Sequence, residues 1–260
     1  MGTNLISTKA SIGRNVKIGI NVRIYDNVVV GDDSSIGDFC VLGHPTTGPL
    51  QDKPLSIGEN SVIRSHSVLY EGSSFGNNLR VGHFSLLREG IAAGTDLQIG
   101  SYNDLEGDTT IGDWVRFHSN VHIGRGSSIG DFVWIFPNSV LTNDPIPPSG
   151  LKEGVTVAAG AVICTGAVAL PNTTIGRGAF IAAMSRARGH IPGGALVVGS
   201  SGEVIGSIRK LHHKVTGKQH PWMSHFSNNY PQEAQNKLKK LHAQIENDIN
   251  ILETTSLPKK

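Results

Sequence analysis

The most constraining feature of this chain is an apolar residue at every sixth position, very often followed by glycine. Ile12-Gly13, Ile18-Gly19 and Val30-Gly31 open the series, which continues with two interruptions to Ile205-Gly206. A period of six fits neither an α-helix nor a sheet of hairpins. Repetition at a fixed short period is typical of solenoid architectures. The sequence therefore predicts a coil built from six-residue units.

Each unit is interpreted as one short strand plus a bend, with three units in every coil. Successive coils then stack at the spacing of hydrogen-bonded strands, about 4.8 Å. The first and fifth residues of a unit point inward, and glycine in second place lets the backbone turn the corner. The predicted fold is all-β, a left-handed parallel β-helix of about ten coils over residues 1–206. The alternative, a sandwich or barrel, expects strands every 8–12 residues or so.

Two stretches break the rhythm, residues 44–54 and residues 144–154, and both contain prolines that regular strands exclude. A whole number of coils separates them, so both loops are expected to leave the same corner of the prism. Loops carried by a rigid scaffold commonly shape sites. Two loops at one corner could wall a cleft against a neighbouring subunit.

The tail differs from the rest of the chain. After Gly206 the rhythm ends, and residues 207–260 are predicted to form a helical extension. Pro231 suits the first turn of an amphipathic helix. The apolar residues that follow it at spacings of three and four are Leu238, Leu241, Ile245, Ile249 and Leu252. This helix is expected to pack on the prism or on a partner subunit, with Trp222 and Phe226 in short helical or irregular pieces before it.

Composition excludes several classes of function. A formal net charge of +2 gives no electrostatic support for binding nucleic acid or a membrane surface. No apolar stretch is long enough to span a bilayer, and the first residues lack the pattern of a signal peptide. A cytoplasmic location is therefore expected. Cys40 falls at an inward position and Cys164 beside one, so both are interpreted as reduced core residues.

The last repeats resemble the final coils of acyl-coenzyme-A-dependent members of the left-handed β-helix, or hexapeptide-repeat, acyltransferases. The segments that carry this resemblance are 175–185 (IGRGAFIAAMS), 191–199 (IPGGALVVG) and 204–206 (VIG). Residues 200–203 (SSGE) replace the Gly-Asn-Pro-Ala-like turn that usually follows in the family. The resemblance covers essentially the whole chain.

Four further segments resemble N-acetyltransferases that act on nucleotide-linked amino sugars: residues 117–122 (FHSNVH), 133–137 (VWIFP), 141–145 (LTNDP) and 221–226 (PWMSHF). The nearest likeness is to enzymes using dTDP-linked 3-amino-3,6-dideoxyhexoses. The resemblance implies transfer of an acetyl or similar short acyl group from acyl-coenzyme A, without a metal, in the biosynthesis of surface polysaccharide or glycan sugars such as lipopolysaccharide or S-layer glycan. It also implies a homotrimer with sites between subunits.

Transfer of an acyl group to an amine needs an aligned neutral amine, support for the developing oxyanion and a proton acceptor. His122 is the last residue of its unit, so its ring is expected to point outward. Asp104 has the same phase one coil earlier and should neighbour it, where a carboxylate can hold one tautomer or attract an ammonium group. We predict that His122 and Asp104 are catalytic and that Asn143 and Asp144 contact the sugar. The alternatives are an exposed surface histidine, or an orienting His122 while the coenzyme A sulfur takes the proton, as in related dideoxysugar enzymes.

A second set of side chains shares an outward phase at intervals of one coil: Arg80, Gln98, Arg116 and Trp134. The arginines suit a pyrophosphate group and the indole suits stacking on a base, so these residues are candidates for substrate binding. Packing at a trimer interface is the alternative. His118 occupies a position usually taken by glycine, and it is a further substrate-binding candidate whose direction the pattern leaves open.

Candidate coenzyme A contacts lie in or just past the final coils, where members of the family hold the adenosine phosphate. The planar guanidinium of arginine suits phosphate, and the basic candidates are Arg186, Arg188, Arg209 and Lys210. Small residues could admit the pantetheine arm, and these are Ala167, Ala182, Ala183 and Ser185. A solvated basic edge and tight corners that require small residues are the alternatives.

Three rival functions remain. The fold also houses zinc carbonic anhydrases, but Arg88 stands where the second histidine of their Gly-His-x4-His element belongs, and His83 and His118 do not stack in phase. A non-enzymatic scaffold is a second rival. The runner-up among enzymes is an O-acetyltransferase acting on serine or a small alcohol. The acyl chain, the sugar, the position of its amine and the choice of dTDP or UDP stay open.

Overall fold

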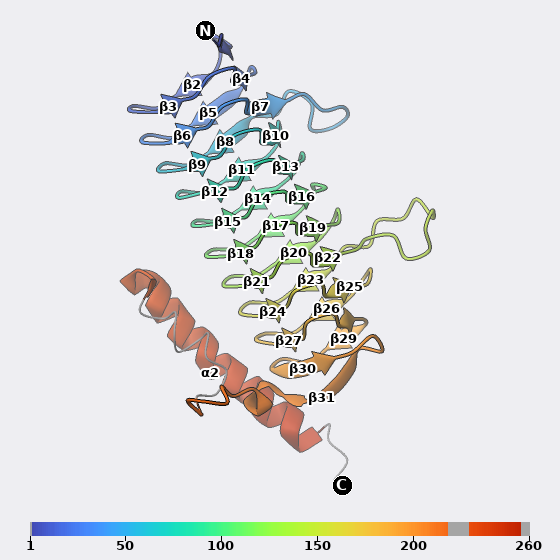
Figure 1. Ribbon diagram of the computed structural model, residues 1–260. Helices are drawn as coiled ribbons and strands as arrows, with labels where there is room; N and C mark the ends of the chain where they lie inside the picture. The colour runs from blue at the N-terminus through green and yellow to red at the C-terminus, as the bar shows by residue number, and fades with distance from the viewer. Residues whose placement is uncertain (1, 218–228, 256–260) are drawn as a thin grey trace.

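The computed structural model describes residues 2–217 and 229–255 of the chain. Short parallel strands wind into a three-sided stack with one long helix beside it (Figure 1). Each side of the stack is one sheet, and neighbouring strands of a sheet come from successive coils. The predicted parallel β-helix of about ten coils with a C-terminal helix is confirmed.

The described strands form sheets A, B and C, and their bounds are as follows. Sheet A holds β1 (Leu5–Ile6), β4 (Arg23–Ile24), β7 (Val41–His44), β10 (Val68–Tyr70), β13 (Leu86–Leu87), β16 (Asp104–Leu105), β19 (His122–Ile123), β22 (Val140–Leu141), β25 (Val168–Ala169) and β28 (Arg186–Ala187). Sheet B holds β2 (Ser11–Ile12), β5 (Val28–Val30), β8 (Leu55–Ile57), β11 (Ser74–Phe75), β14 (Ala92–Ala93), β17 (Thr110–Ile111), β20 (Ser128–Ile129), β23 (Thr156–Val157), β26 (Thr174–Ile175) and β29 (His190–Ile191). Sheet C holds β3 (Lys17–Ile18), β6 (Ser35–Ile36), β9 (Val62–Ile63), β12 (Arg80–Val81), β15 (Gln98–Ile99), β18 (Arg116–Phe117), β21 (Trp134–Ile135), β24 (Val162–Ile163), β27 (Phe180–Ile181), β30 (Ala195–Val198) and β31 (Glu203–Ser207).

The interior of the stack is filled as the repeat predicts. From β4 onward the inward residue of each two-residue strand is buried except Ala93 of β14, and Leu105 and Ile123 have 0% exposure each. Fifth-position residues such as Val115 and Val133 are also buried, between the strands. Fully burying one such aliphatic side chain contributes roughly 1.5–3 kcal/mol. Cys40 is buried and Cys164 half-buried, and both are free thiols.

The last repeats depart from the prediction. β30 and β31 pair antiparallel, whereas the other described strand pairs are parallel. The predicted repeat at Ile205-Gly206 therefore does not form a further parallel coil, and the chain instead turns back along β30. This reversal ends the stack with a hairpin, after which the short 3-10 helix η1 (Ile208–Lys210) begins.

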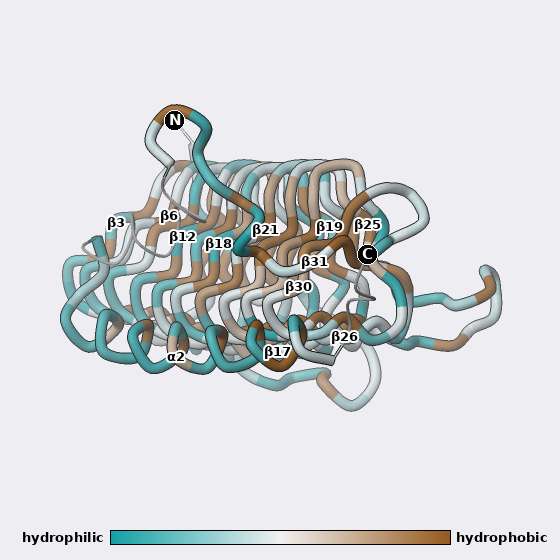
Figure 2. The backbone as a smooth tube through the Cα atoms, turned by 90° about the horizontal axis from the view of Figure 1, so that it is seen from below, coloured by the Kyte–Doolittle hydropathy of each residue, from teal (hydrophilic) through white to brown (hydrophobic). Residues whose placement is uncertain are grey.

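The helix α2 (Gln232–Thr255) lies on the outside of the chain's own prism (Figures 1 and 2). The five predicted apolar residues are all buried. A Cβ atom at Gly178, where φ is +61°, would lie 2.7 Å from Ile245, so a glycine at this corner lets the helix approach closely. Arg177 also binds Asp248 of the helix through two nitrogens at 3.0 Å.

Both irregular loops leave from the same edge of the stack, as the repeat predicts. The first connects β7 to β8 and the second connects β22 to β23, so each passes from sheet A to sheet B. They project from the same side of the molecule, the second farther along the axis (Figure 1). No helix among residues 2–217 and 229–255 has the length and apolar character needed to cross a bilayer.

Candidate functional site

The first part of the site lies on the outer face of sheet A, on the two strands that precede β22 and the loop 144–154. β16 and β19 are neighbouring parallel strands, and the Cα partner of His122 is Asp104. Because side chains alternate along a strand, the inward direction of Leu105 and Ile123 sends these two polar side chains outward. The predicted pairing across one coil is confirmed.

His122 lies between two carboxylates. Its Nδ1 is 3.3 Å from Oδ2 of Asp104, and its Nε2 is 3.6 Å from Oε1 of Glu106. The imidazole is 34% exposed, so it is accessible from solvent. The hydrogen bond with Asp104 raises the pKa of His122 above its ordinary value, although burial acts in the opposite direction. The charges of Asp104 and Glu106 add to this rise.

Glu106 is itself fixed from the other side. Its Oε2 accepts hydrogen bonds from Nδ2 of Asn143 at 2.6 Å and from the backbone N–H of Arg125 at 3.1 Å. Asn143 is 8% exposed and follows β22 at the start of the second loop. The structure therefore brings Asn143 to the His122 cluster, although its contact is with Glu106 rather than with His122.

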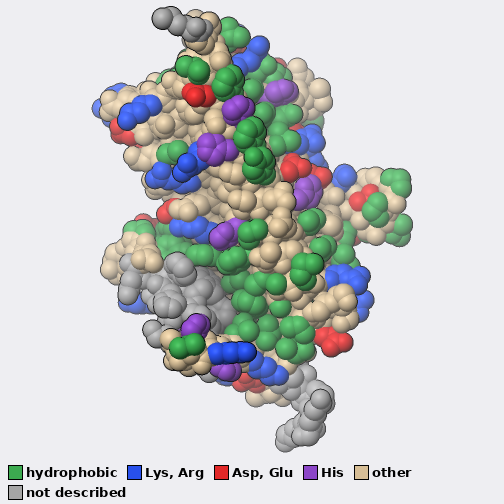
Figure 3. Space-filling view, in the orientation of Figure 1, with side chains coloured by type: hydrophobic (Ala, Val, Ile, Leu, Met, Phe, Trp, Pro, Cys, Tyr) green, Lys and Arg blue, Asp and Glu red, His purple; other side chains and the backbone are tan. Residues whose placement is uncertain are grey.

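Further charged side chains continue along this edge toward the first loop. The guanidinium of Arg125 binds Glu89 and Asp108. Glu71 is 6% exposed and accepts a hydrogen bond from the backbone N–H of Thr46 in the first loop. In the space-filling view, acidic and histidine side chains lie side by side at the base of the projecting loop 144–154 (Figure 3). Carboxylates outnumber guanidinium groups along this edge, so it favours cationic ligands.

Asp144 has a local role in the loop. Its carboxylate accepts hydrogen bonds from the hydroxyl and the backbone N–H of Ser149, at 2.5 and 3.0 Å, and from the backbone N–H of Ile146 at 3.1 Å. The bond from Ser149 lowers the pKa of Asp144. The carboxylate of Asp144 already accepts three hydrogen bonds within the loop. A contact with the sugar would have to be made in addition to them.

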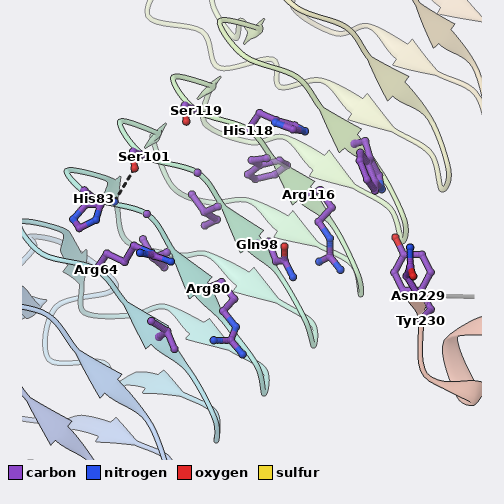
Figure 4. Close-up of a pocket in the computed structure, with 17 residues that line it drawn as sticks. Arg64, Arg80, His83, Gln98, Ser101, Arg116, His118, Ser119, Asn229 and Tyr230 are labelled. Carbon is purple, nitrogen blue, oxygen red and sulfur yellow. Dashed lines mark hydrogen bonds between the residues drawn. The ribbon is translucent and has the colours of Figure 1, made fainter. Parts of the chain in front are cut away.

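The second part of the site is a groove of about 810 Å³ on the outer face of sheet C (Figure 4). Arg80, Gln98 and Arg116 extend into it from successive strands, as their common phase predicts. Other side chains of the lining are Arg64, His83, His118, Trp134, Asn229 and Tyr230. Within the described part of the chain, neither Arg64 nor Arg80 has a side-chain hydrogen bond or ion pair, so two guanidinium groups are available to an anionic ligand.

Arg116 and His118 are held within this groove. Nη1 of Arg116 donates to the backbone carbonyl of Asp96 at 2.8 Å and lies 3.2 Å from its carboxylate. The ring of His118 stacks on Phe136 with centroids 4.5 Å apart, and burial lowers the pKa of His118. The pKa of His118 is therefore shifted in the opposite direction from that of His122. The two histidines lie on either side of the corner between sheets C and A.

The candidate coenzyme contacts divide into three groups. Ala167 and Ser185 are 0% and 2% exposed, so they face the prism interior and cannot touch a pantetheine arm. These two predictions are wrong, because both residues occupy the inward fifth position of their units. Ala182 and Ala183 lie on the surface. The third group consists of the four basic residues, Arg186, Arg188, Arg209 and Lys210.

Among those basic residues, Arg209 binds Glu246 at 2.7 Å and Glu253 at 2.6 Å. These two ion pairs join η1 to α2. Lys210 donates to the backbone carbonyl of Ile205. Arg186 donates to the backbone carbonyl of Ser200 at 2.6 Å. Arg188 is exposed. Arg186, Arg188 and Lys210 are therefore the exposed basic candidates, whereas Arg209 is half-buried.

The main residue missed from the sequence is Glu106. It follows Asp104 by two positions on the same strand edge, which places both side chains on the outer face, and this spacing alone could have identified it. Tyr230, in the groove, comes from the segment before α2 and has no signal in the repeat. The motif at residues 221–226 lies outside the described residues, as do Trp222 and Phe226. Among residues 2–217 and 229–255, no three His, Cys, Asp or Glu side chains are grouped as metal ligands.

Comparison with known proteins supports the repeat and the fold. Residues 9–44 match the family described as bacterial transferase hexapeptide (six repeats). No curated protein matches the chain. The UDP-N-acetylglucosamine acyltransferase of Arabidopsis is similar in structure, with a TM-score of 0.66, 17% identity, and 98% of this chain and 97% of that chain covered.

Two bacterial structures are also similar. The UDP-N-acetylglucosamine acyltransferase of Francisella novicida has a TM-score of 0.41 at 15% identity, over 91% of this chain and 76% of that chain. The enzyme of the same name from Campylobacter jejuni has a TM-score of 0.44 at 12% identity, over 91% of this chain and 80% of that chain. The family match and the Arabidopsis structure together confirm the hexapeptide repeat and its β-helical fold.

Proposed function

We propose that this chain is an acyltransferase that moves an acetyl or similar short acyl group from acyl-coenzyme A to the amino group of a dTDP-linked amino-dideoxyhexose. Such a product would serve the biosynthesis of surface polysaccharide or glycan sugars. The observation that carries the proposal is an accessible imidazole, His122, held between carboxylates on a rigid sheet face beside a projecting loop. A positioned imidazole of this kind can accept the proton that the amine loses as it attacks.

The position of Asp104 supports a base role for His122. With a proton on Nδ1 bound by Asp104, the neutral ring presents the lone pair of Nε2. Nε2 can then take a proton from the acceptor amine as its nitrogen attacks the thioester carbonyl. The C–N bond forms, the C–S bond breaks and the thiolate leaves.

The groove on sheet C supports a nucleotide as the carrier of the sugar. Arg64, Arg80 and Arg116 offer planar donors for a pyrophosphate group, and Trp134 offers a surface for a base. The Arabidopsis neighbour is named for a nucleotide-linked sugar, which agrees with this class of substrate. Arg186, Arg188, Lys210, Ala182 and Ala183 are the proposed contacts of coenzyme A.

A homotrimer is part of the proposal, because the groove and His122 lie on different faces of one prism. The corner between these faces carries a column of stacked rings formed by Phe39, His66, Phe84 and Tyr102, with centroid separations of 4.9, 4.6 and 5.3 Å. Three of these rings are 45–60% exposed. Exposed aromatic surface of this extent supports burial against another copy of the chain.

The proposal is tested by incubating the protein with acetyl-coenzyme A and a panel of dTDP- and UDP-linked amino sugars, with release of free thiol as the measurement. We expect thiol release with at least one dTDP-linked amino-dideoxyhexose and an amide product by mass spectrometry. Serine and small alcohols form the control arm for the alternative O-acyl transfer. Thiol release with an alcohol and with no amine would reject the proposed acceptor.

The raised pKa of His122 predicts the pH dependence of the reaction. Neutral imidazole is the active form, so kcat/KM should fall as the pH drops through a pKa above the ordinary 6.5. Asp104→Asn removes the largest cause of the rise, so the acidic limb should move to lower pH. The measurement is kcat/KM from pH 5 to 9 for both proteins. An acidic limb that stays in place in the variant would assign it to the substrate amine instead.

A further inference from the structure

The two oxygens of Glu106 have different surroundings. Oε2 is occupied by the side-chain amide of Asn143 and the backbone N–H of Arg125, at 2.6 and 3.1 Å. Oε1 lies 3.6 Å from Nε2 of His122, which is the nitrogen left facing outward when Nδ1 binds Asp104. This separation exceeds a hydrogen bond. The acidic oxygen and the basic nitrogen therefore lie near one another and could both be reached by one incoming polar atom.

The negative charge of Glu106 is available to that incoming group, because the neighbouring guanidinium does not neutralise it. The nearest guanidinium, on Arg125, binds Glu89 and Asp108, and only its backbone N–H reaches Glu106. Asn143 contributes a neutral donor. Within the described residues, His122 is the one cationic or potentially cationic side chain paired with Glu106.

Amines and hydroxyl groups differ in how well they suit this arrangement. A neutral amine carries two N–H hydrogens and a lone pair, so it can direct one hydrogen to Nε2 and the other to Oε1 while the lone pair faces the thioester. A hydroxyl group has a single hydrogen. If that hydrogen is given to Nε2, the hydroxyl oxygen then faces the Glu106 carboxylate with no donor between them, and like partial charges repel.

We propose that Glu106 makes the site selective for an amine over a hydroxyl group, by accepting a second hydrogen bond from the nitrogen that faces His122. Asn143 is a positioning residue, because it fixes the carboxylate from behind. This inference rests on the proposed function and specifies which chemical feature of the acceptor is recognised.

The step balances as follows. The neutral amine directs one N–H to Nε2 of neutral His122 and the other to Oε1 of Glu106. Its lone pair attacks the thioester carbonyl, the C–N bond forms, and Nε2 takes the proton that faces it. The C–S bond breaks, and the thiolate leaves with the electron pair of that bond. The remaining N–H stays on the amide nitrogen, and His122 returns its proton to solvent.

The test compares two ligands in wild-type protein and in Glu106→Gln, which keeps the shape of the side chain and removes its charge. The ligands are a dTDP-linked 3-amino-3,6-dideoxyhexose and its 3-hydroxy counterpart, with Kd measured by titration calorimetry. Hydrogen bonds to charged groups support an expected loss of about 10- to 100-fold in the preference for the amine. Binding of the hydroxyl compound should weaken little or improve.

Asp108→Asn is the matched control, because it removes a neighbouring carboxylate that binds Arg125, whereas the carboxylates beside His122 are those of Asp104 and Glu106. It should leave the preference unchanged. Glu106→Asp keeps the charge, so it should retain more of the preference than the glutamine variant. A preference that survives in Glu106→Gln, or an equal loss for both ligands, would overturn the inference.

The calorimetric comparison and the thiol-release panel together separate this inference from the proposed function. If the wild-type protein acylates no amine in the panel, the proposed function fails and the selectivity role fails with it. If the wild-type protein acylates an amine while Glu106→Gln keeps its preference, the selectivity role alone is rejected.

Discussion

Replacing His122 with asparagine is expected to lower kcat/KM for acyl transfer by about 10²–10⁴-fold, the usual contribution of a general base. Asparagine keeps a polar side chain of similar reach but cannot take a proton at neutral pH. The side chain is 34% exposed and lies outside the core, so the fold and the assembly should survive. The measurement is steady-state release of coenzyme A, with circular dichroism and light scattering on the same sample.

His242→Asn provides a matched control. This histidine also lies near a carboxylate, with Nε2 3.6 Å from Oε1 of Glu246, but it is on the outer helix and 56% exposed. It should keep wild-type kcat/KM. A loss well below a hundredfold in His122→Asn would show that the imidazole orients the amine while the thiolate collects the proton. An unchanged kcat/KM would remove His122 from the site.

The pairing of His122 with Asp104 could be predicted because the repeat fixes both phase and direction. Every coil has the same number of residues in this part of the chain, so side chains in equal positions must be neighbours. The same reasoning places the two loops at one edge. It also places Arg80 and Arg116 in one column, and all three predictions agree with the structure.

Where the prediction failed, the causes differ. The prediction for Ala167 and Ser185 rests on their small size, although their fifth positions direct them inward, so the repeat itself contains the correction. Arg209 could not be assigned in this way. Its partners Glu246 and Glu253 lie on α2, and no repeat relates that helix to the coils. Contacts between the prism and α2 depend on tertiary packing that local periodicity does not encode.

Replacing Leu105 with alanine is expected to produce the largest loss of stability at the site. The side chain is 0% exposed and lies between Asp104 and Glu106 in the chain, beneath both carboxylates. Large-to-small changes at such positions lower the free energy of unfolding by about 2–5 kcal/mol, because transfer energy is lost and a cavity remains. Relaxation of this coil around the cavity should also displace the carboxylates of Asp104 and Glu106. Small misplacements of reacting groups reduce rates strongly.

Leu42→Ala separates the two effects, because Leu42 is also 0% exposed and belongs to sheet A, on β7, three strands before β16. Urea unfolding at one protein concentration should give a similar loss of free energy for both variants. Only Leu105→Ala should lose a further tenfold or so in kcat/KM under conditions where both are folded. Equal kcat/KM in the two variants would mean that the core of this coil does not set the positions of Asp104 and Glu106, and that the neighbouring coils hold them instead.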